Sequence, residues 1–239
     1  GIVAGRRRLD AAALRAMTAA LAARGPDGEG FHVTAEVGLG HRRLAVIDVA
    51  GGKQPLFGAQ GRVAAVVNGE IYNHVALRAE LEGLGHRFAT RCDAETVVHG
   101  YVAWGQGVLS RLDGQFALAV WDGNLRRVLL ARDRLGEKPL YWTHLADGAL
   151  VFASTLAALR RHPDVSQAVD PAALARYLVA EYVPSPRALL RGVHKVAPGA
   201  LVEMAVGRPP TTRIWWNPPV GVSGESDAVG DGADADVLT

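Results

Sequence analysis

The stretch GQFALAVWDGNLRRVLLAR, residues 114–132, holds two apolar runs at 115–121 and 127–132. Asp122-Gly123-Asn124 separates them, and turn residues of this kind between two apolar runs predict a β-hairpin. Two further apolar runs follow, with an Asp-Gly pair between them, at residues 139–143 and 149–153. The centre of the chain is therefore predicted to form antiparallel strands.

The regions around this centre predict helices and more strands. Asp10 can cap a helix in which Leu14, Met17 and Leu21 share one face. A second helix is expected after Asn73, with three leucines facing inward: Leu77, Leu81 and Leu84. Two more helices are expected at 95–104 and after Pro171, and strands at 1–5, 31–37, 40–48, 62–67, 200–206 and 212–216. Because helices and strands come in blocks, the pattern predicts an α+β fold with largely antiparallel sheets.

The composition is that of a folded globular protein. Of the 239 residues, 49% are hydrophobic and 21% are charged, which excludes a disordered, collagen-like or coiled-coil protein. No apolar run approaches the roughly 18 residues of a transmembrane helix, and no signal peptide is visible. Cys92 is the single cysteine, so an internal disulfide is excluded, and the histidines show no metal-ligand spacing. We therefore expect a cytoplasmic protein with no membrane partner and no metal site.

The net charge of +2 hides an uneven distribution along the chain. Residues 217–239 are rich in Gly, Ser and Ala and contain no Lys or Arg, but they contain five acids: Glu225, Asp227, Asp231, Asp234 and Asp236. This composition predicts an acidic linker that follows a single domain at 1–216. The one tight basic cluster, Arg6-Arg7-Arg8, has no aromatic residues interleaved with it, so a solvated loop is favoured over a nucleic-acid partner.

Polar residues stand near the ends of two predicted strands. Arg43 lies at the head of an apolar run, where an Arg can bind a carboxylate with two parallel hydrogen bonds or simply lie at the surface. Asn68-Gly69 follows the predicted strand 62–67. An Asn-Gly pair there is usually a hairpin turn, but it also offers a side-chain amide and an unobstructed N–H, the two donors of an oxyanion hole.

Two acids complete this set of polar residues. Glu70 can hold an ammonium group, and Asp93 can either do the same or cap the helix predicted at 95–104. A cation, two anions and a pair of donors together describe a pocket for a zwitterionic amino acid with a polarised carbonyl. The spacing alone leaves the simpler interpretations open.

Seven short motifs carry a resemblance to a known family. In chain order they are GIVAG (1–5), RGPDG (24–28), RLAVID (43–48), NGEIYN (68–73), LDGQFA (112–117), ARDRLGEKPLY (131–141) and FAS (152–154). The chain from Gly1 to about Trp216 resembles the class II glutamine amidotransferase domain of asparagine synthetase-type enzymes. The resemblance implies an N-terminal-nucleophile hydrolase fold, which is a four-layer αββα sandwich of two antiparallel sheets. It also implies hydrolysis of L-glutamine to L-glutamate and ammonia.

The resemblance implies a role for each residue of the polar set. Arg43 would bind the glutamine α-carboxylate, with backbone atoms of Leu44 and Ile47 lining the same part of the pocket. Asn68 and Gly69 would form the oxyanion hole. The α-ammonium would be held by two carboxylates: Glu70 and Asp93. The segment 132–141 would shape the scaffold and the face toward a synthetase domain, without a catalytic part.

The family nucleophile is an N-terminal cysteine directly before the Gly-Ile pair, with its own α-amine as the base. It is expected directly before Gly1, and Cys92 cannot replace it because the nucleophile needs a free α-amine. The resemblance further implies a C-terminal ATP-pyrophosphatase domain that uses Mg-ATP and accepts ammonia on a carboxylate, most plausibly that of aspartate. The amidotransferase domain itself needs no cofactor, and a homodimer is possible. Two alternatives stay open: a regulatory or structural domain of an ammonia-dependent synthetase, and a glutaminase that serves a natural-product or peptide acceptor.

Overall fold

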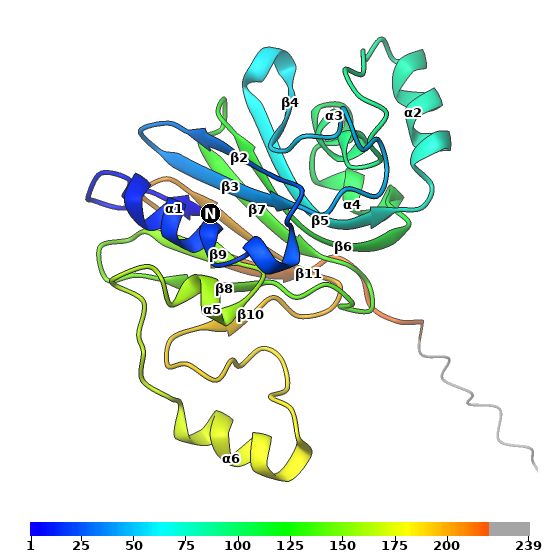
Figure 1. Ribbon diagram of the computed structural model, residues 1–239. Coiled ribbons are helices and arrows are strands. Elements are labelled where there is room, and N and C mark those ends of the chain that lie inside the picture. The colour runs from blue at the N-terminus through cyan, green and yellow to red at the C-terminus, as the bar shows by residue number, and fades with distance from the viewer. Residues whose placement is uncertain (220–239) are drawn as a thin grey trace, which may run out of the picture.

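Two antiparallel sheets form the centre of the molecule (Figure 1). The computed structural model describes residues 1–219, so residues 220–239 of the predicted acidic linker lie outside the described residues. The first sheet contains β1 (Ile2–Val3), β2 (Gly28–Val33), β3 (Val37–Arg43), β8 (Tyr141–His144), β9 (Leu150–Ala153) and β10 (His194–Lys195). The second contains β4 (Leu56–Gly58), β5 (Val63–Ile71), β6 (Gly114–Asp122), β7 (Arg127–Arg132), β11 (Ala200–Ala205) and β12 (Thr211–Ile214).

Helices cover the outer face of each sheet. Along the first sheet the strand order is β10-β8-β9-β1-β3-β2, and along the second it is β12-β11-β7-β6-β5-β4. The first sheet is covered by α1 (Ala11–Ala19) and α5 (Leu156–Leu159), and the second by α2 (His74–Gly83), α3 (Glu95–Trp104) and α4 (Val108–Arg111). The predicted four-layer αββα sandwich is therefore confirmed. Within residues 1–219, no helix has the length and apolar character needed to cross a membrane.

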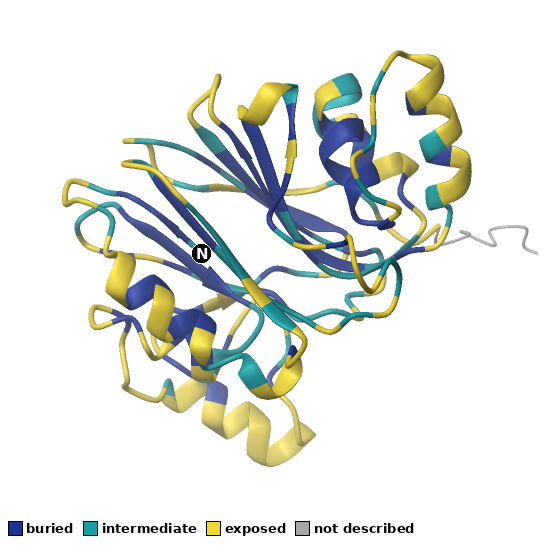
Figure 2. Cartoon of the chain, turned by 45° about the horizontal axis from the view of Figure 1, so that its top comes forward, coloured by how far each residue is buried: buried dark blue, intermediate teal, exposed yellow. Residues whose placement is uncertain are grey.

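Three apolar clusters fill the three spaces between these four layers. Because side chains alternate along a strand, neighbouring residues of one strand enter different clusters. Ile2 packs with the helices on the first sheet, whereas Val3 packs between the sheets. In β5, Ala64 lies between the sheets, whereas Val63 and Ala65 face α3. Figure 2 shows the resulting buried strands, with buried residues also on the inner sides of the helices that cover them.

Most predicted elements form where the sequence placed them. The hairpin is confirmed as β6 and β7, with Trp121 paired to Val128. Asp10 caps α1 by accepting from the Ala13 N–H at 2.9 Å, and the helix predicted at 95–104 is α3. The helix predicted after Pro171 is α6 (Pro171–Ala180), and it is almost entirely exposed (Figure 2).

Several boundaries were wrong. The strand predicted at 62–67 continues as β5 to Ile71, so Asn68-Gly69 lies inside a strand and not in a hairpin turn. The strand predicted at 40–48 ends at Arg43. Leu84 is 59% exposed, because α2 ends at Gly83. The strand predicted at 31–37 is displaced because residues 34–36 form the turn between β2 and β3. The short strands β4 and β10 were not predicted.

The segment that follows β7 is fixed by two adjacent side chains. The Arg132 guanidinium donates to the carbonyls of Lys138, at 2.6 Å, Val196, at 2.9 Å, and Gly136. The Asp133 carboxylate, which is 1% exposed, accepts from four backbone N–H groups: Phe116, Leu135, Glu137 and Lys138. One side chain thus satisfies the carbonyls and the next satisfies the amides, which agrees with the scaffold role expected for residues 132–141.

Replacing the Asp133 carboxylate should therefore destabilise the fold. Asp133→Asn keeps the shape but turns an NH2 group toward backbone N–H donors, so we expect the free energy of unfolding to fall by about 2–4 kcal/mol. Urea denaturation measures this change. Asp113→Asn is the matched control, because Asp113 is exposed. Equal effects of the two substitutions would contradict the assigned role.

Candidate active site

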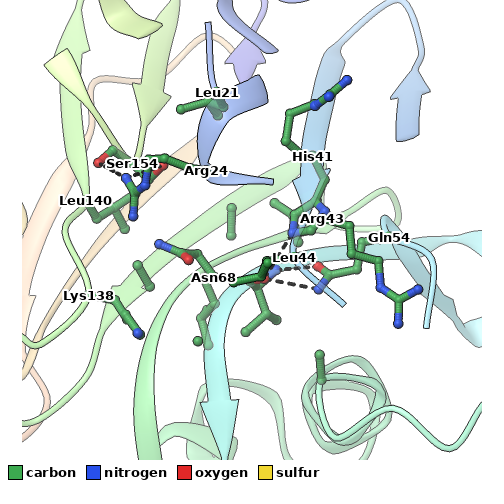
Figure 3. Close-up of a pocket in the computed structure, with 18 of the residues that line it drawn as sticks. Leu21, Arg24, His41, Arg43, Leu44, Gln54, Asn68, Lys138, Leu140 and Ser154 are labelled. Atoms are coloured by element: carbon green, nitrogen blue, oxygen red, sulfur yellow. Dashed lines mark hydrogen bonds between the residues drawn. The ribbon is translucent and has the colours of Figure 1, made fainter. Parts of the chain in front are cut away.

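One pocket of about 420 Å³ receives residues from both sheets. Its walls include parts of β3 and β9 from the first sheet and of β5 and β6 from the second. The structure brings all seven residues of the predicted polar set to this pocket: Arg43, Leu44, Ile47, Asn68, Gly69, Glu70 and Asp93. Figure 3 shows Arg43 and Leu44 on one side of the pocket and Lys138, Leu140 and Ser154 on the other. The roles of these residues toward a ligand stay predictions.

The side chain of Asn68 points between the two sheets. On β5, Ala64 and Val66 pack into the apolar cluster between the sheets, and Asn68 is the next residue of that alternating series. Its Nδ2 atom is buried, and no described residue accepts a hydrogen bond from it. An unpaired buried donor costs free energy, so this amide is ready for an acceptor that enters the pocket.

The backbone of Gly69 faces away from the neighbouring strand β6. Gly69 stands opposite Phe116, whose N–H and carbonyl both bond Asp133, at 3.2 and 2.8 Å. Gly69 and Phe116 are therefore a non-hydrogen-bonded pair of the antiparallel ladder. The two residues of such a pair direct their N–H and carbonyl groups away from each other. The Gly69 N–H therefore points to the opposite edge of β5.

Side chains occupy that edge on both sides of Gly69. β4 pairs with β5 only as far as Ala65, which leaves the edge beyond it open. The Val67 N–H donates to Gln54 Oε1 at 2.7 Å, and the Ile71 N–H donates to Asp93 Oδ2 at 2.7 Å. Between these two satisfied amides, the Gly69 N–H is directed toward the pocket beside the Asn68 amide.

Only glycine fits at position 69. Its φ is 148°, and a Cβ there would lie 1.9 Å from the Gln115 carbonyl oxygen. Gly69 is thus needed for the close approach of β5 to β6 and not for a turn. The sequence suggested that a glycine is needed here for a hairpin turn. The structure shows that the glycine is needed because β6 packs closely against it.

Arg43 is held by the connection that follows β3. Its guanidinium donates to the carbonyls of Ile47 at 3.1 Å, Asp48 at 2.5 Å and Val49 at 2.7 Å. These carbonyls turn toward Arg43 instead of continuing a strand, and Asp48 adopts a φ of 52°. This explains why the strand predicted to reach residue 48 ends early. The Leu44 side chain is 63% exposed, so any contact it makes in the pocket is through its backbone or at the rim.

Asp93 does not cap α3. Its carboxylate is 4% exposed and accepts from the Ile71 N–H and from the Cys92 thiol, the latter at 3.4 Å. The residue at the N-cap of α3 is Ala94, without a side-chain cap. The helix-cap alternative for Asp93 is therefore wrong, and its carboxylate instead joins the start of α3 to the end of β5.

The Gly1 nitrogen occupies a position in a β-ladder. It donates to the Phe152 carbonyl at 2.6 Å, and the Phe152 N–H donates back to the Gly1 carbonyl at 2.9 Å. Burial lowers the pKa of this amino nitrogen from 8.0 to about 4. The position therefore suits an uncharged backbone N–H and disfavours an ammonium group. Gly1 also lines the pocket, as does Phe152.

A family model described as a glutamine amidotransferase domain matches residues 1–216. The chain belongs to this glutamine amidotransferase family. It is 42% identical to asparagine synthetase [glutamine-hydrolyzing] 2 of Bacillus subtilis over 63% of this chain and 20% of that protein. It is 40% identical to a putative asparagine synthetase [glutamine-hydrolyzing] of Mycobacterium tuberculosis over 76% of this chain and 30% of that protein. The chain thus spans less than a third of the length of these curated relatives.

The structural comparison supports the fold assigned to this amidotransferase domain. The glutamine phosphoribosylpyrophosphate amidotransferase of B. subtilis aligns with a TM-score of 0.54 and 21% identity, over 77% of this chain and 36% of that one. At this identity the likeness concerns the fold alone. It agrees with the predicted α+β fold of two antiparallel sheets covered by helices.

Several pocket residues of the amidotransferase domain received no role from sequence reasoning, among them His41, Gln54 and Lys138. Figure 3 shows Gln54 joined by two dashed lines to the backbone beside Asn68. Gln54 lies in a Gly-rich stretch that carries no helix or strand pattern. The hydrogen bonds that Gln54 makes depend on which strands pair, and the amino-acid pattern does not give that pairing.

Cys92 should be unreactive in the folded amidotransferase domain. Burial, together with the nearby Asp93 carboxylate, raises the pKa of its thiol from 9.0 to about 11. Because the thiolate is the reactive species, iodoacetamide at pH 8 should label Cys92 slowly in the native protein and rapidly in denaturant. Mass spectrometry of both samples measures the difference, and rapid native labelling would contradict the described burial.

Proposed function

We propose that this domain hydrolyses the side-chain amide of L-glutamine to L-glutamate and ammonia. The observation that carries the proposal is the unpaired, buried Asn68 Nδ2 beside the outward-facing Gly69 N–H. Two such donors stabilise the oxyanion that forms when a carbonyl is attacked. A purely structural domain would gain nothing from an unsatisfied buried amide in a pocket.

The remaining pocket residues suit the amino-acid end of glutamine. The Arg43 guanidinium would bind the α-carboxylate, with the backbone of Leu44 and Ile47 completing that part of the pocket. The Glu70 and Asp93 carboxylates would hold the α-ammonium. This arrangement would fix one end of glutamine and direct its side-chain carbonyl toward Asn68 and Gly69.

We further propose that the nucleophile is a cysteine joined directly to Gly1. The ladder of β1 and β9 pairs Ile2 with Val151 and Gly1 with Phe152, so the preceding residue would stand opposite Ala153 at the pocket. Its thiol would give its proton to its own α-amine, and the sulfur would attack the amide carbon. The amine would then protonate the leaving nitrogen, the C–N bond would break, and ammonia would leave. Water would hydrolyse the thioester to glutamate and the free thiol.

The names of the relatives support a proposal for the whole protein. Ammonia would pass to a C-terminal ATP-pyrophosphatase domain that uses Mg-ATP to activate a carboxylate, with aspartate as acceptor and asparagine as product. The amidotransferase domain would need no cofactor or metal. A homodimer and a cytoplasmic location stay predictions of the sequence.

The test compares two forms of the whole protein that differ only at the position before Gly1. One form has cysteine there, with its α-amine free, and the other has alanine. We expect the cysteine form to release glutamate from L-glutamine and to lose this activity after treatment with a glutamine-analogue thiol alkylator. We expect no release from the alanine form. Equal release from both forms, or none from either, would reject the proposed mechanism.

Asn68→Ala should lower turnover much more than it weakens binding. It removes a donor that acts mainly on the oxyanion, so kcat for glutamate release should fall by roughly 10²–10³-fold while KM for glutamine changes little. Steady-state kinetics of the cysteine form measures both constants. A rise in KM with an unchanged kcat would show that Asn68 binds the substrate and does not stabilise the transition state.

Arg43→Ala should mainly raise KM for glutamine, by roughly 10–100-fold, because it removes the cation that binds the α-carboxylate. Arg43→Lys should recover only part of this loss, since a lysine ammonium cannot form two parallel bonds to a carboxylate. Arg42→Ala is the matched control, because Arg42 bonds Glu29 at 3.1 Å and the Gly25 carbonyl at 3.0 Å. Equal KM values for the Arg43 variants and the unsubstituted enzyme would exclude the carboxylate role.

A further inference from the structure

We infer that Gln54 is a positioning residue for the proposed oxyanion donors Asn68 and Gly69. Its side-chain amide takes the place that the backbone of a neighbouring strand would occupy, and it pairs with Val67, the residue directly before Asn68. This inference deepens the proposed glutaminase function and rests on it. The geometry that carries it is a pair of hydrogen bonds. Gln54 Oε1 accepts from the Val67 N–H at 2.7 Å, and Gln54 Nε2 donates to the Val67 carbonyl at 3.1 Å.

The strand register explains why this pair of bonds resembles a β-ladder. β4 pairs with β5 at Leu56–Ala65, Phe57–Ala64 and Gly58–Val63. Continuing this register by two residues places Gln54 opposite Val67. A backbone residue in that position would exchange one N–H and one carbonyl bond with Val67. The Gln54 side chain makes the same exchange, because a primary amide presents one donor and one acceptor side by side.

The backbone of Gln54 is not available for this pairing. β4 begins only at Leu56, and a Cβ on Gly30 would lie 2.0 Å from the Gln54 carbonyl oxygen. The main chain of Gln54 thus packs against β2 of the first sheet, while its side chain binds β5 of the second. Gln54 therefore connects the two sheets at the wall of the pocket.

A second side chain from the first sheet strengthens this connection. His41 on β3 places its Nε2 3.2 Å from the same Val67 carbonyl. Burial lowers the pKa of His41 to about 4, so the ring is neutral near pH 7 and donates this bond from a protonated Nε2. The Val67 carbonyl therefore accepts from both Gln54 and His41, and its peptide group is fixed from two directions.

The consequence concerns the next two residues. Asn68 follows Val67 directly, and its unpaired amide together with the Gly69 N–H must meet one substrate oxygen. A donor displaced by about 1 Å can lose roughly 100-fold in rate. Without Gln54, the Val67 N–H loses its partner and the Val67 carbonyl keeps only His41, so we expect the two donors to lose their alignment. Glutamine binding through Arg43 should change much less.

The experiment uses the whole protein in the cysteine form and the variant Gln54→Met. Methionine keeps nearly the same length and volume but makes neither hydrogen bond. We expect kcat for glutamate release, per active site titrated with the glutamine-analogue alkylator, to fall by roughly 10–100-fold. We expect KM for glutamine to change by less than about threefold.

Gln60→Met is the matched control, because Gln60 is exposed in the short 3-10 helix η2 (Ala59–Gly61) and should keep the unsubstituted kcat.

A second readout separates alignment from general loss of folding. Amide hydrogen exchange should increase at Val67 in Gln54→Met and stay unchanged at Ala64, which is paired with β6. An unchanged kcat per titrated site, or a kcat loss with unchanged exchange at Val67, would overturn the inference and leave the proposed function intact. Failure of the unsubstituted cysteine form to release glutamate would instead reject the proposed function, and the inference with it.

Discussion

The edge of β5 beyond Ala65 is the constraint on which the site depends. Buried backbone groups need hydrogen-bond partners, and β4 is too short to supply them. Gln54 and Asp93 supply partners for Val67 and Ile71. Gly69 lies between these satisfied positions, and its N–H is directed toward the pocket. The same edge thus stabilises the sheet and presents the N–H that we propose as an oxyanion donor.

The second proposed donor, the Asn68 side-chain amide, is placed by the packing of the two sheets. Alternation along β5 directs Asn68 into the space between the sheets, where the apolar cluster ends and the pocket begins. The ladder of β1 and β9 brings Gly1 to the same pocket from the other sheet. A nucleophile joined to Gly1 and an oxyanion hole on β5 would therefore face each other across the sandwich. The fold places the two halves of the proposed reaction on different sheets.

Much of this arrangement could be predicted from the sequence. The hairpin at 115–132 and α3 were read from local patterns, and the resemblance of the motifs predicted the layers and the polar pocket residues. Two kinds of information were not local. Asn68-Gly69 resembles a turn in sequence, and only its pairing with Ala117 and Phe116 of β6 shows that it belongs to a strand. Gln54 has no pattern of its own, because its pairing with Val67 follows from the register of β4 on β5.

The most direct measurement is a crystal structure of the whole protein, in the cysteine form, carrying a covalently bound glutamine analogue that mimics the tetrahedral intermediate. Our account predicts that the analogue oxygen lies about 2.7–3.1 Å from both Asn68 Nδ2 and the Gly69 nitrogen. It also predicts that Gln54 still bonds both backbone groups of Val67. An oxygen that points toward Lys138 or solvent, with neither donor within hydrogen-bond distance, would contradict the account.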